Sequence, residues 1–226
     1  IEQEMTEYKI SLIPGDGIGP ELTEATLKVL DSVQNHFNLK LKIIEAEAGD
    51  ATLAKRGVAL PEDTVQKIKD SHVCLKGPVG ETAADVIVKL RLMFDLYANL
   101  RPLKAYPNVP VARPDIDMMF VRENTEDVYK GLEFTIGNDT TLCLRVITRG
   151  ACERIAKKAF EIARLRNGKK KVTAIHKANV MRITDGLFAS VCRETAKQYP
   201  DIAYNELYVD AASMRLIKEP QVFDVL

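Results

Sequence analysis

Strand-like and helix-like segments alternate through the first third of the chain, and this alternation constrains the fold more than any other feature. Apolar runs typical of strands cover residues 8–13, 39–46 and 72–75, and the last of these is expected to be buried. Segments with helical spacing of apolar side chains lie between them, over 20–35 and 61–68. This order is typical of a parallel sheet covered by helices, so the sequence predicts an α/β fold.

A proline-rich stretch separates this region from the rest of the chain. Residues 101–114 contain four prolines, a density that argues against regular structure. We therefore expect a crossover between two domains near this point, with the first domain over residues 1–98 and the second over residues 99–226.

The region beyond the crossover also mixes strands and helices. Residues 132–135 and 141–148 alternate in the manner of two paired strands around a turn at 137–139. The segments that follow are predicted in this order: a helix closed by Asn167 and Gly168, a strand at 172–175, a helix at 184–198, a strand at 203–209, a helix at 211–218 and the start of a strand at 222–226.

Charge and apolar pattern argue against two classes of protein. Lys+Arg and Asp+Glu number 32 each, so the net charge is zero, whereas a dedicated nucleic-acid binder carries a basic excess. No apolar run approaches the roughly 20 residues of a membrane-spanning helix, and residues 1–4 lack the layout of a secretion signal. We expect a cytoplasmic protein that binds neither nucleic acid nor membrane.

The cysteine pattern fits the same compartment. Four cysteines are scattered along the chain without C-x-x-C spacing: Cys74, Cys143, Cys152 and Cys192. Such a pattern predicts small buried hydrophobic side chains in a reducing cytosol, and neither a disulfide framework nor a zinc site.

The stretch from Arg122 to Tyr129 holds the most concentrated polar chemistry. It follows an apolar run at 118–121 that is typical of a short buried strand, and it contains an arginine, three acids, an amide and a tyrosine. A guanidinium is always charged and binds carboxylates through a fork, while a phenol can give and take a proton. The pairing suggests a site for an acidic small molecule.

Two further arginines lie at the ends of predicted elements upstream. Arg91 and Arg101 frame an extended segment, and Arg122 follows after a strand. Three such arginines can converge on one multiply charged anion through bidentate contacts. The alternative, that each arginine forms its own salt bridge, stays open at this point.

Lys177 and Asp210 each follow a predicted strand. A lysine surrounded by cationic groups loses pKa and becomes a usable base, although an exposed lysine without a special role is the alternative. Asp210 offers one oxygen ligand to a hard cation such as Mg²⁺ or Mn²⁺, or it caps a helix that begins at Ala211. His176 is expected to be structural, because nothing near it has metal-ligand spacing.

The glycines of the first predicted turn do not complete a dinucleotide-binding motif. Gly15, Gly17 and Gly19 lie between a strand and a helix, but the third glycine comes one position too early for G-x-G-x-x-G. The turn can still approach a ligand closely. The spacing argues against a Rossmann fold.

Six ordered blocks resemble the β-decarboxylating dehydrogenases, the family of isocitrate, isopropylmalate, homoisocitrate and related hydroxyacid dehydrogenases. The resemblance covers residues 8–226. The blocks are Gly-Asp-Gly-Ile-Gly-Pro at 15–20, Leu-Arg at 90–91, Asp-Leu-Tyr-Ala-Asn-Leu-Arg-Pro at 95–102, Arg-Glu-Asn-Thr-Glu-Asp-Val-Tyr at 122–129, His-Lys-Ala-Asn-Val-Met at 176–181 and Tyr-Val-Asp-Ala at 208–211.

The resemblance implies a role for each site residue. Substrate carboxylates would be bound by the three arginines, and Asn179 would also contact the substrate. Lys177 would take the hydroxyl proton as hydride leaves for NAD, with NADP as the alternative cofactor. Tyr129 would protonate C3 after loss of CO₂. Asp210 would be a ligand of Mg²⁺ or Mn²⁺, which stabilises the enolate.

The resemblance also implies an assembly and a longer chain. The family has its own two-domain α/β fold, distinct from a Rossmann domain, and the lysine and aspartate reach the site from a neighbouring subunit. We therefore expect a homodimer with shared active sites, formed through the second, smaller domain; assembly to a tetramer stays open. Family chains continue past Leu226 with further metal ligands, the cofactor-binding loop and the other half of the first domain, so cofactor-binding residues are unknown. If the 226 residues were a whole polypeptide, we would expect an inactive fragment.

The residues before Arg91 bear on the substrate. Isocitrate enzymes hold the third carboxylate with a serine and an asparagine where this chain has Asp85 and Ile87, followed by Val88. An acid would repel that carboxylate, and two aliphatic side chains suit an isopropyl group. The resemblance thus favours 3-isopropylmalate and leucine biosynthesis. Isocitrate, homoisocitrate or malate stay open as substrates, as does a non-catalytic regulatory subunit.

Overall fold

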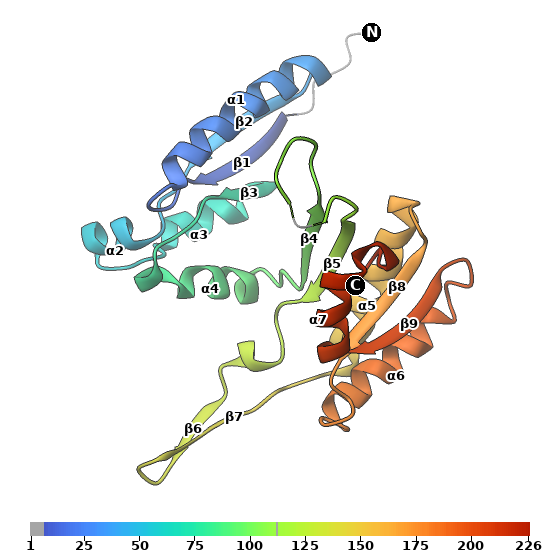
Figure 1. The fold of residues 1–226 in the computed structure, drawn as a ribbon. Coiled ribbons are helices and arrows are strands. Elements are labelled where there is room, and N and C mark those ends of the chain that lie inside the picture. Colours follow the sequence, from blue (N-terminus) through green and yellow to red (C-terminus); the bar gives the residue numbers. More distant parts are fainter. Residues whose placement is uncertain (1–6, 112) are drawn as a thin grey trace. The chain divides into compact units, whose positions relative to one another are not determined.

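The computed structural model describes residues 7–111 and 113–226. The chain forms two compact units that divide between Leu90 and Arg91, eight residues before the expected boundary at 98/99. Figure 1 shows the elements of each unit. Within the described residues, no helix is long and apolar enough to cross a membrane.

The first unit contains a three-stranded parallel sheet with helices, as the alternation predicted. Strand β1 (Glu7–Ile13) lies between β2 (Lys40–Glu45) and β3 (Val73–Lys76). The helices are α1 (Gly19–Phe37), α2 (Asp50–Arg56), α3 (Glu62–Lys69) and α4 (Asp85–Met93), with a 3-10 turn, η1 (Glu81–Ala83), before α4.

Local sequence explains where α1 begins and ends. Pro20 occupies its first turn, where a missing N–H leaves no hydrogen bond unmade. Asn38 ends the helix in the left-handed region with φ of 52°, a conformation that asparagine tolerates.

The expectation of a buried third strand was wrong. Val73 in β3 is 54% exposed, because β3 is an edge of the described sheet and pairs only with β1 there. The central strand is the buried one, with Leu12 and Ile13 almost fully enclosed.

The second unit is built on a mixed sheet. Strand β4 (Ala98–Lys104) pairs antiparallel with β5 (Asp117–Glu123), and β8 (Lys171–His176) pairs parallel with β9 (Ala203–Tyr208). Val225 forms parallel bridges to both Met119 and Val172, so the last residues join the two pairs. The strand predicted to start near residue 222 is thus hydrogen-bonded on both sides.

Helices cover both faces of this sheet (Figure 1). On one face, Phe160 of α5 (Arg149–Arg166) packs in a core with Val172 and Val225, and Cys192 of α6 (Thr184–Ala196) adjoins it. On the other face, α7 (Val209–Lys218) and the 3-10 turn η3 (Pro220–Val222) pack over Met118 and Leu226. Alternation along each strand divides the apolar side chains between these two layers.

The expectation that residues 101–114 lack regular structure was wrong for residues 101–104, which belong to a strand. Strand β4 continues through Pro102 to Lys104, and Pro102 lies opposite Met119 of β5. A proline is tolerated there because β4 is an edge strand of the described sheet, where an N–H can be absent without breaking a ladder hydrogen bond.

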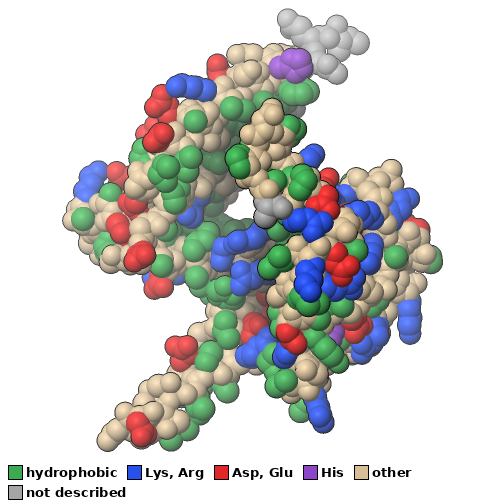
Figure 2. Space-filling view, in the orientation of Figure 1, with side chains coloured by type: hydrophobic (Ala, Val, Ile, Leu, Met, Phe, Trp, Pro, Cys, Tyr) green, Lys and Arg blue, Asp and Glu red, His purple; other side chains and the backbone are tan. Residues whose placement is uncertain are grey.

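The predicted hairpin is present as β6 (Glu133–Ile136) and β7 (Thr140–Cys143), and it projects from the rest of its unit (Figure 1). Its second strand was expected to reach residue 148 but ends at Cys143. All residues of both strands are exposed, including Phe134 and Ile136, and hydrophobic side chains lie on its surface in Figure 2.

All four cysteines are free thiols, as predicted, but their burial differs. Cys152 and Cys192 are buried, and burial raises their pKa to about 11 and about 12. Cys74 is half-buried, and Cys143 on the projecting hairpin is exposed, which corrects the expectation for that residue.

Candidate active site

Arg122 and Tyr129 lie in direct contact. Arg122 is near the end of β5, and Tyr129 follows in the 3-10 turn η2 (Val128–Lys130). A guanidinium N–H of Arg122 donates to the Tyr129 hydroxyl oxygen at 2.5 Å, and its carbon lies 5.2 Å from the ring centroid. The phenol oxygen accepts this bond and keeps its own proton to donate.

Arg101 and Arg122 share one face of the β4–β5 pair. Asn99 lies directly opposite Arg122, and Arg101 is two residues further along β4, so all three side chains point to the same side. Arg101 donates to the Asn99 amide oxygen at 3.3 Å. No carboxylate within residues 7–111 and 113–226 forms an ion pair with Arg101 or Arg122. The salt-bridge alternative therefore fails for these two arginines, and both charges are available to an anion.

Arg91 lies half-buried in the last turn of α4 and is the first residue of the second unit in the chain. Helix α4 is continuous from Asp85, so spacing of four and three residues sets Ile87 and Val88 on the same side of the helix as Arg91. Its convergence with Arg101 and Arg122 stays a prediction.

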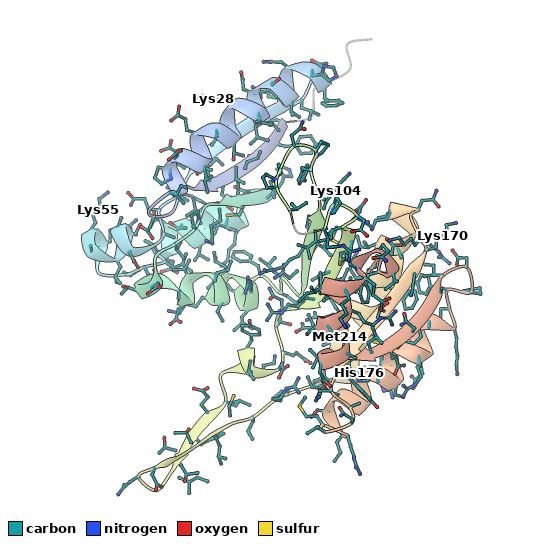
Figure 3. All side chains as sticks on the ribbon, in the orientation of Figure 1. Lys28, Lys55, Lys104, Lys170, His176 and Met214 are labelled. Atoms are coloured by element: carbon teal, nitrogen blue, oxygen red, sulfur yellow. The ribbon has the colours of Figure 1, made fainter. Side chains whose placement is uncertain are left out.

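Lys177 and Asp210 lie side by side at one edge of the sheet. Because β8 and β9 are parallel and His176 pairs with Tyr208, the residues that follow each strand emerge together. Figure 3 labels His176, the residue that ends β8. The Lys177 ammonium donates to the Asp210 carboxylate, and this bond lowers the pKa of Asp210.

Asp210 is not the cap of a helix that begins at Ala211. Helix α7 begins at Val209 after Tyr208, which sets Asp210 in the first turn. A carboxylate is favoured there by the helix dipole. Asn179 is exposed in the turn after Lys177, where Val180 donates its N–H to the Lys177 carbonyl at 3.0 Å.

His176 has the structural role that the sequence indicated. The Ala178 N–H donates to Nδ1 of His176 at 3.2 Å, so Nε2 carries the ring proton of the neutral form. Nε2 lies 3.2 Å from a Glu206 oxygen, and that carboxylate also accepts from Arg193 and Tyr204. Both nitrogens are thus occupied within the chain.

Three residues near the site were missed by sequence reasoning. Arg145 holds Asp127 through both carboxylate oxygens at 2.5 Å and Asp185 at 3.0 Å, and Asp185 accepts the Lys177 backbone N–H at 2.6 Å. Asp127 belonged to a recognised block, but Arg145 and Asp185 are distant in sequence and carried no local signal.

A cavity of about 510 Å³ lies within the second unit beside these residues. Arg122, Tyr129 and Arg145 line its polar part, and Phe188 and Cys192 line its apolar part. The cavity therefore extends from Arg122 and Tyr129 to the core beneath α5 and α6.

The glycine turn of the first unit is closed on its own backbone. A side chain at Gly15 would lie 1.8 Å from the Pro78 carbonyl oxygen, and one at Gly19 would lie 2.2 Å from that of Pro14. Asp16 accepts backbone N–H bonds from Asp50, Ala51 and Gly80 at 2.7, 3.0 and 2.9 Å. These glycines allow chain segments to approach each other, so the idea of close approach to a ligand has no support here.

The described residues fit a divalent cation only in part. Asp210 is an oxygen donor, but no group of three or more acidic, histidine or cysteine side chains in residues 7–111 and 113–226 is arranged to hold a metal. A cation at this position would need ligands from outside the described chain.

Comparison with known proteins identifies the family. Residues 9–226 match the family profile described as isocitrate/isopropylmalate dehydrogenase. The chain is 50% identical over 219 residues to the 3-isopropylmalate dehydrogenase of Saccharolobus solfataricus, covering 97% of this chain and 64% of that protein. It is 41% identical over 221 residues to the mitochondrial NAD isocitrate dehydrogenase regulatory subunit 1 of Arabidopsis thaliana, covering 96% and 58%.

The fold agrees with the sequence match. The crystal structure of isocitrate dehydrogenase from Methylococcus capsulatus superposes with a TM-score of 0.90 at 40% identity, covering 97% of this chain and 66% of that one. The chain belongs to the isocitrate/isopropylmalate dehydrogenase family. It spans about two thirds of the length of these relatives, so part of the family fold lies outside it.

Proposed function

We propose that the protein catalyses the NAD-dependent oxidative decarboxylation of 3-isopropylmalate, a step of leucine biosynthesis. The observation that carries the proposal is the contact of Arg122 with Tyr129, beside Arg101 on the same sheet face. Two unpaired guanidinium groups next to a phenol suit an acid that must be held and then protonated.

Arg91, Arg101 and Arg122 bind the substrate carboxylates, with Asn179 as a further contact. A guanidinium offers two parallel N–H donors to a carboxylate. The exposure of Arg101 and Arg122 without a carboxylate partner in the described chain supports this role.

Lys177 and Tyr129 move the two protons. Lys177 takes the proton of the C2 hydroxyl as hydride leaves C2, which leaves a ketone. The bond from C3 to its carboxylate then breaks, CO₂ departs, and the electron pair forms an enolate. Tyr129 gives its phenolic proton to C3, and the product is a 2-oxo acid. The Arg122 N–H that the phenol accepts orients this proton donor.

NAD, with NADP as the alternative, would supply the hydride acceptor, and Mg²⁺ or Mn²⁺ would supply positive charge that stabilises the enolate. Asp210 is the one ligand that we assign to the cation, and as a carboxylate it offers the oxygen donors that such a cation prefers. Lys177 would serve as the base in its neutral amine form, and a cation bound by Asp210 would replace the ammonium as the partner of that carboxylate.

The substrate preference rests on α4. Ile87 and Val88 lie on the Arg91 side of a continuous helix, and both are half-buried. Aliphatic side chains there suit a branched alkyl group, each buried CH₂ or CH₃ adding about 0.8 kcal/mol. Identity of 50% to a 3-isopropylmalate dehydrogenase supports the same choice.

A homodimer with shared sites is part of the proposal. The projecting β6–β7 hairpin exposes Phe134 and Ile136, and the region of α6 and α7 exposes Ile183 and Ile217 to 87% and 75%. Apolar side chains so exposed are typical of an interface. Lys177 and Asp210 of one chain then complete the site that contains Arg122 and Tyr129 of the other.

Two alternatives have specific support. Similarity to an isocitrate dehydrogenase structure favours the same chemistry on isocitrate, homoisocitrate or a malate. Identity of 41% to a regulatory subunit favours a non-catalytic protein. The presence of both Lys177 and Tyr129 argues against the second.

The test is steady-state turnover of the complete natural polypeptide with each acid, NAD or NADP, and Mg²⁺ or Mn²⁺. We expect the highest kcat/KM with 3-isopropylmalate and NAD. A preference for isocitrate would reject the substrate assignment, and no turnover with any acid would reject the catalytic one.

A further inference from the structure

We propose that Asp185 and Arg145 are positioning residues that tie the segment carrying Lys177 to the segment carrying Tyr129 within one chain. The proposal rests on the function proposed above for Lys177 and Tyr129. Neither positioning residue touches the reacting atoms; both act through the residues that they hold.

Asp185 has both oxygens committed to this link. It lies at the start of α6 and is 7% exposed. One oxygen accepts the Lys177 backbone N–H at 2.6 Å, and the other accepts from Arg145 at 3.0 Å. A buried carboxylate is stable only when it is paired and hydrogen-bonded, so neither contact can be lost without cost.

Arg145 carries the link to the other segment. Its fork binds both oxygens of Asp127, two residues before Tyr129, and this pairing raises the pKa of the guanidinium further. The Arg145 side chain thus contacts Asp127 and Asp185 at once, and it also contacts the Met181 sulfur.

The segment before Tyr129 needs such a restraint. Asp127 has φ of 64° and ψ of −136°, a region that residues with a side chain rarely adopt. Its N–H donates to the Val146 carbonyl at 2.9 Å, next to Arg145 in the chain. Backbone in a disfavoured conformation persists only where its surroundings hold it. Arg145 therefore fixes where η2 begins, and with it the phenol.

The link has a consequence in the proposed dimer. Lys177 of one chain and Tyr129 of the same chain serve different active sites there. A rigid tie between them, through Asp185, Arg145 and Asp127, joins the two active sites of the dimer through side chains of a single chain.

The first experiment compares kcat and KM of Asp185→Ala, Asp185→Asn and Arg145→Lys in the complete polypeptide. For Asp185→Ala we expect kcat to fall on the order of 100-fold, since a small displacement of a catalytic group has this effect, with KM within about threefold because the arginines are untouched. Asp185→Asn keeps an acceptor for the Lys177 N–H, so kcat should fall only about tenfold.

Asp201→Asn is the matched control. Asp201 is held by an Arg164 fork at 2.5 and 3.1 Å, the same type of pair, at an exposed place away from Lys177 and Tyr129. The kcat of Asp201→Asn should change less than about twofold, because an exposed ion pair contributes little to stability. If Asp185→Ala lowers the melting temperature but leaves kcat per folded site like the control, the positioning role is wrong.

Amide hydrogen exchange separates this proposal from the proposed function. Asp185→Asn and Arg145→Lys should each speed exchange both at Lys177 and over residues 127–129, whereas Asp201→Asn should do neither. Faster exchange at Lys177 alone would show that the two segments are not tied. Hydrogen exchange can be measured without turnover. An inactive wild-type protein would therefore reject the proposed function, while the exchange rates would still test the link between the two segments.

A mixed dimer tests the link between sites. A Lys177→Met chain paired with a Tyr129→Phe chain has one intact site, whose Tyr129 comes from the first chain and whose Lys177 comes from the second. Adding Asp185→Ala to the first chain should lower turnover about tenfold, through Arg145 and Asp127. Unchanged turnover there, with loss only when the change is on the second chain, would restrict Asp185 to Lys177 and overturn the tie.

Discussion

Two groups of polar residues in this protein lie at the end of a β-strand, and they differ in how many hydrogen bonds they form within the chain. After β1, the Asp16 carboxylate accepts three backbone N–H bonds, and Gly15 and Gly19 are packed against backbone atoms. Near the end of β5, Arg122 is exposed and donates to the hydroxyl of Tyr129, the residue that we propose as the proton donor. The first group is held by hydrogen bonds within the fold, whereas the second forms no ion pair within the described chain and is the proposed ligand site.

The difference shows that motif strength in a sequence does not separate a structural role from a functional one. The two roles are separated by how many hydrogen bonds and ion pairs the polar atoms already form within the chain. Changes at the β5 site should therefore alter activity, and changes at the β1 turn should alter stability.

The largest expected effect is on turnover, from Lys177→Met or Tyr129→Phe. Loss of a general base or acid should lower kcat on the order of 1,000-fold. Mixing the two inactive variants and allowing subunits to exchange should restore about a quarter of the activity, because half of the dimers then hold one intact shared site. No recovery on mixing, with subunit exchange verified by mass, would place both residues of a site in one chain.

The next effect is on substrate binding, from Arg122→Gln. Loss of a charge-assisted pair costs about 1.5–3 kcal/mol, so KM for the acid should rise about 10- to 100-fold. Arg164→Gln is the control, because Arg164 pairs with Asp201 and contacts no site residue. An unchanged KM in Arg122→Gln would contradict its role in holding the substrate. The melting temperature of Arg122→Gln should change little, since Arg122 has no ion pair within the described chain.

The β1 turn should show the reverse pattern in Asp16→Asn. The amide NH₂ cannot accept the bonds that the carboxylate accepts, so the free energy of unfolding should fall by about 2 kcal/mol, measured by denaturant titration. KM for the acid should stay within about twofold of the wild-type value in this variant. A large rise in KM with unchanged stability would mean that this turn contacts the ligand after all.

The same carboxylate gives a pH dependence with a definite sign. Burial acts to raise the pKa of Asp16, but the backbone N–H groups of Ala51, Gly80 and Asp50, together with the charge of Lys76, lower that pKa overall. Its stabilising contribution is therefore complete above the unfolded value of about 3.9 and is lost as pH falls through the lower folded value. Stability of wild type and Asp16→Asn should converge in this acid range; a constant difference down to the folded pKa and below would contradict the assignment.

The smallest effect is expected from Gly17→Ala. Gly17 has φ of 58°, but a side chain there would meet no atom within 4 Å. Only the left-handed conformation is unfavourable, which costs about 1 kcal/mol. Gly15→Ala is the matched comparison, since it has φ of 78° and no space. Equal unfolding free energies for the two variants would show that close packing of the turn contributes nothing.

Much of the fold was predictable because it depends on local patterns. Helix α5 was recognised from its apolar spacing and from Asn167, which ends it in the left-handed region with φ of 46°. The β6–β7 hairpin followed from alternation around a turn. Burial was less predictable: Val73 and Cys143 are exposed although their residue types favour the interior. Burial depends on which neighbours cover an element, and local patterns carry no record of them.

The sequence by itself determined the α/β class and the family, and it predicted Arg122 and Tyr129 as site residues, because ordered blocks of residues carry this information. Only the tertiary structure decided that Asp16 accepts three backbone N–H bonds, that Arg101 and Arg122 form no ion pair within the described chain, and that Arg145 joins Asp127 to Asp185. The physical reason is that hydrogen bonds and ion pairs act over a few ångströms in space. Arg145 contacts Asp127, which lies 18 positions before it in the chain, and Asp185, which lies 40 positions after it. No rule of sequence spacing relates these three residues.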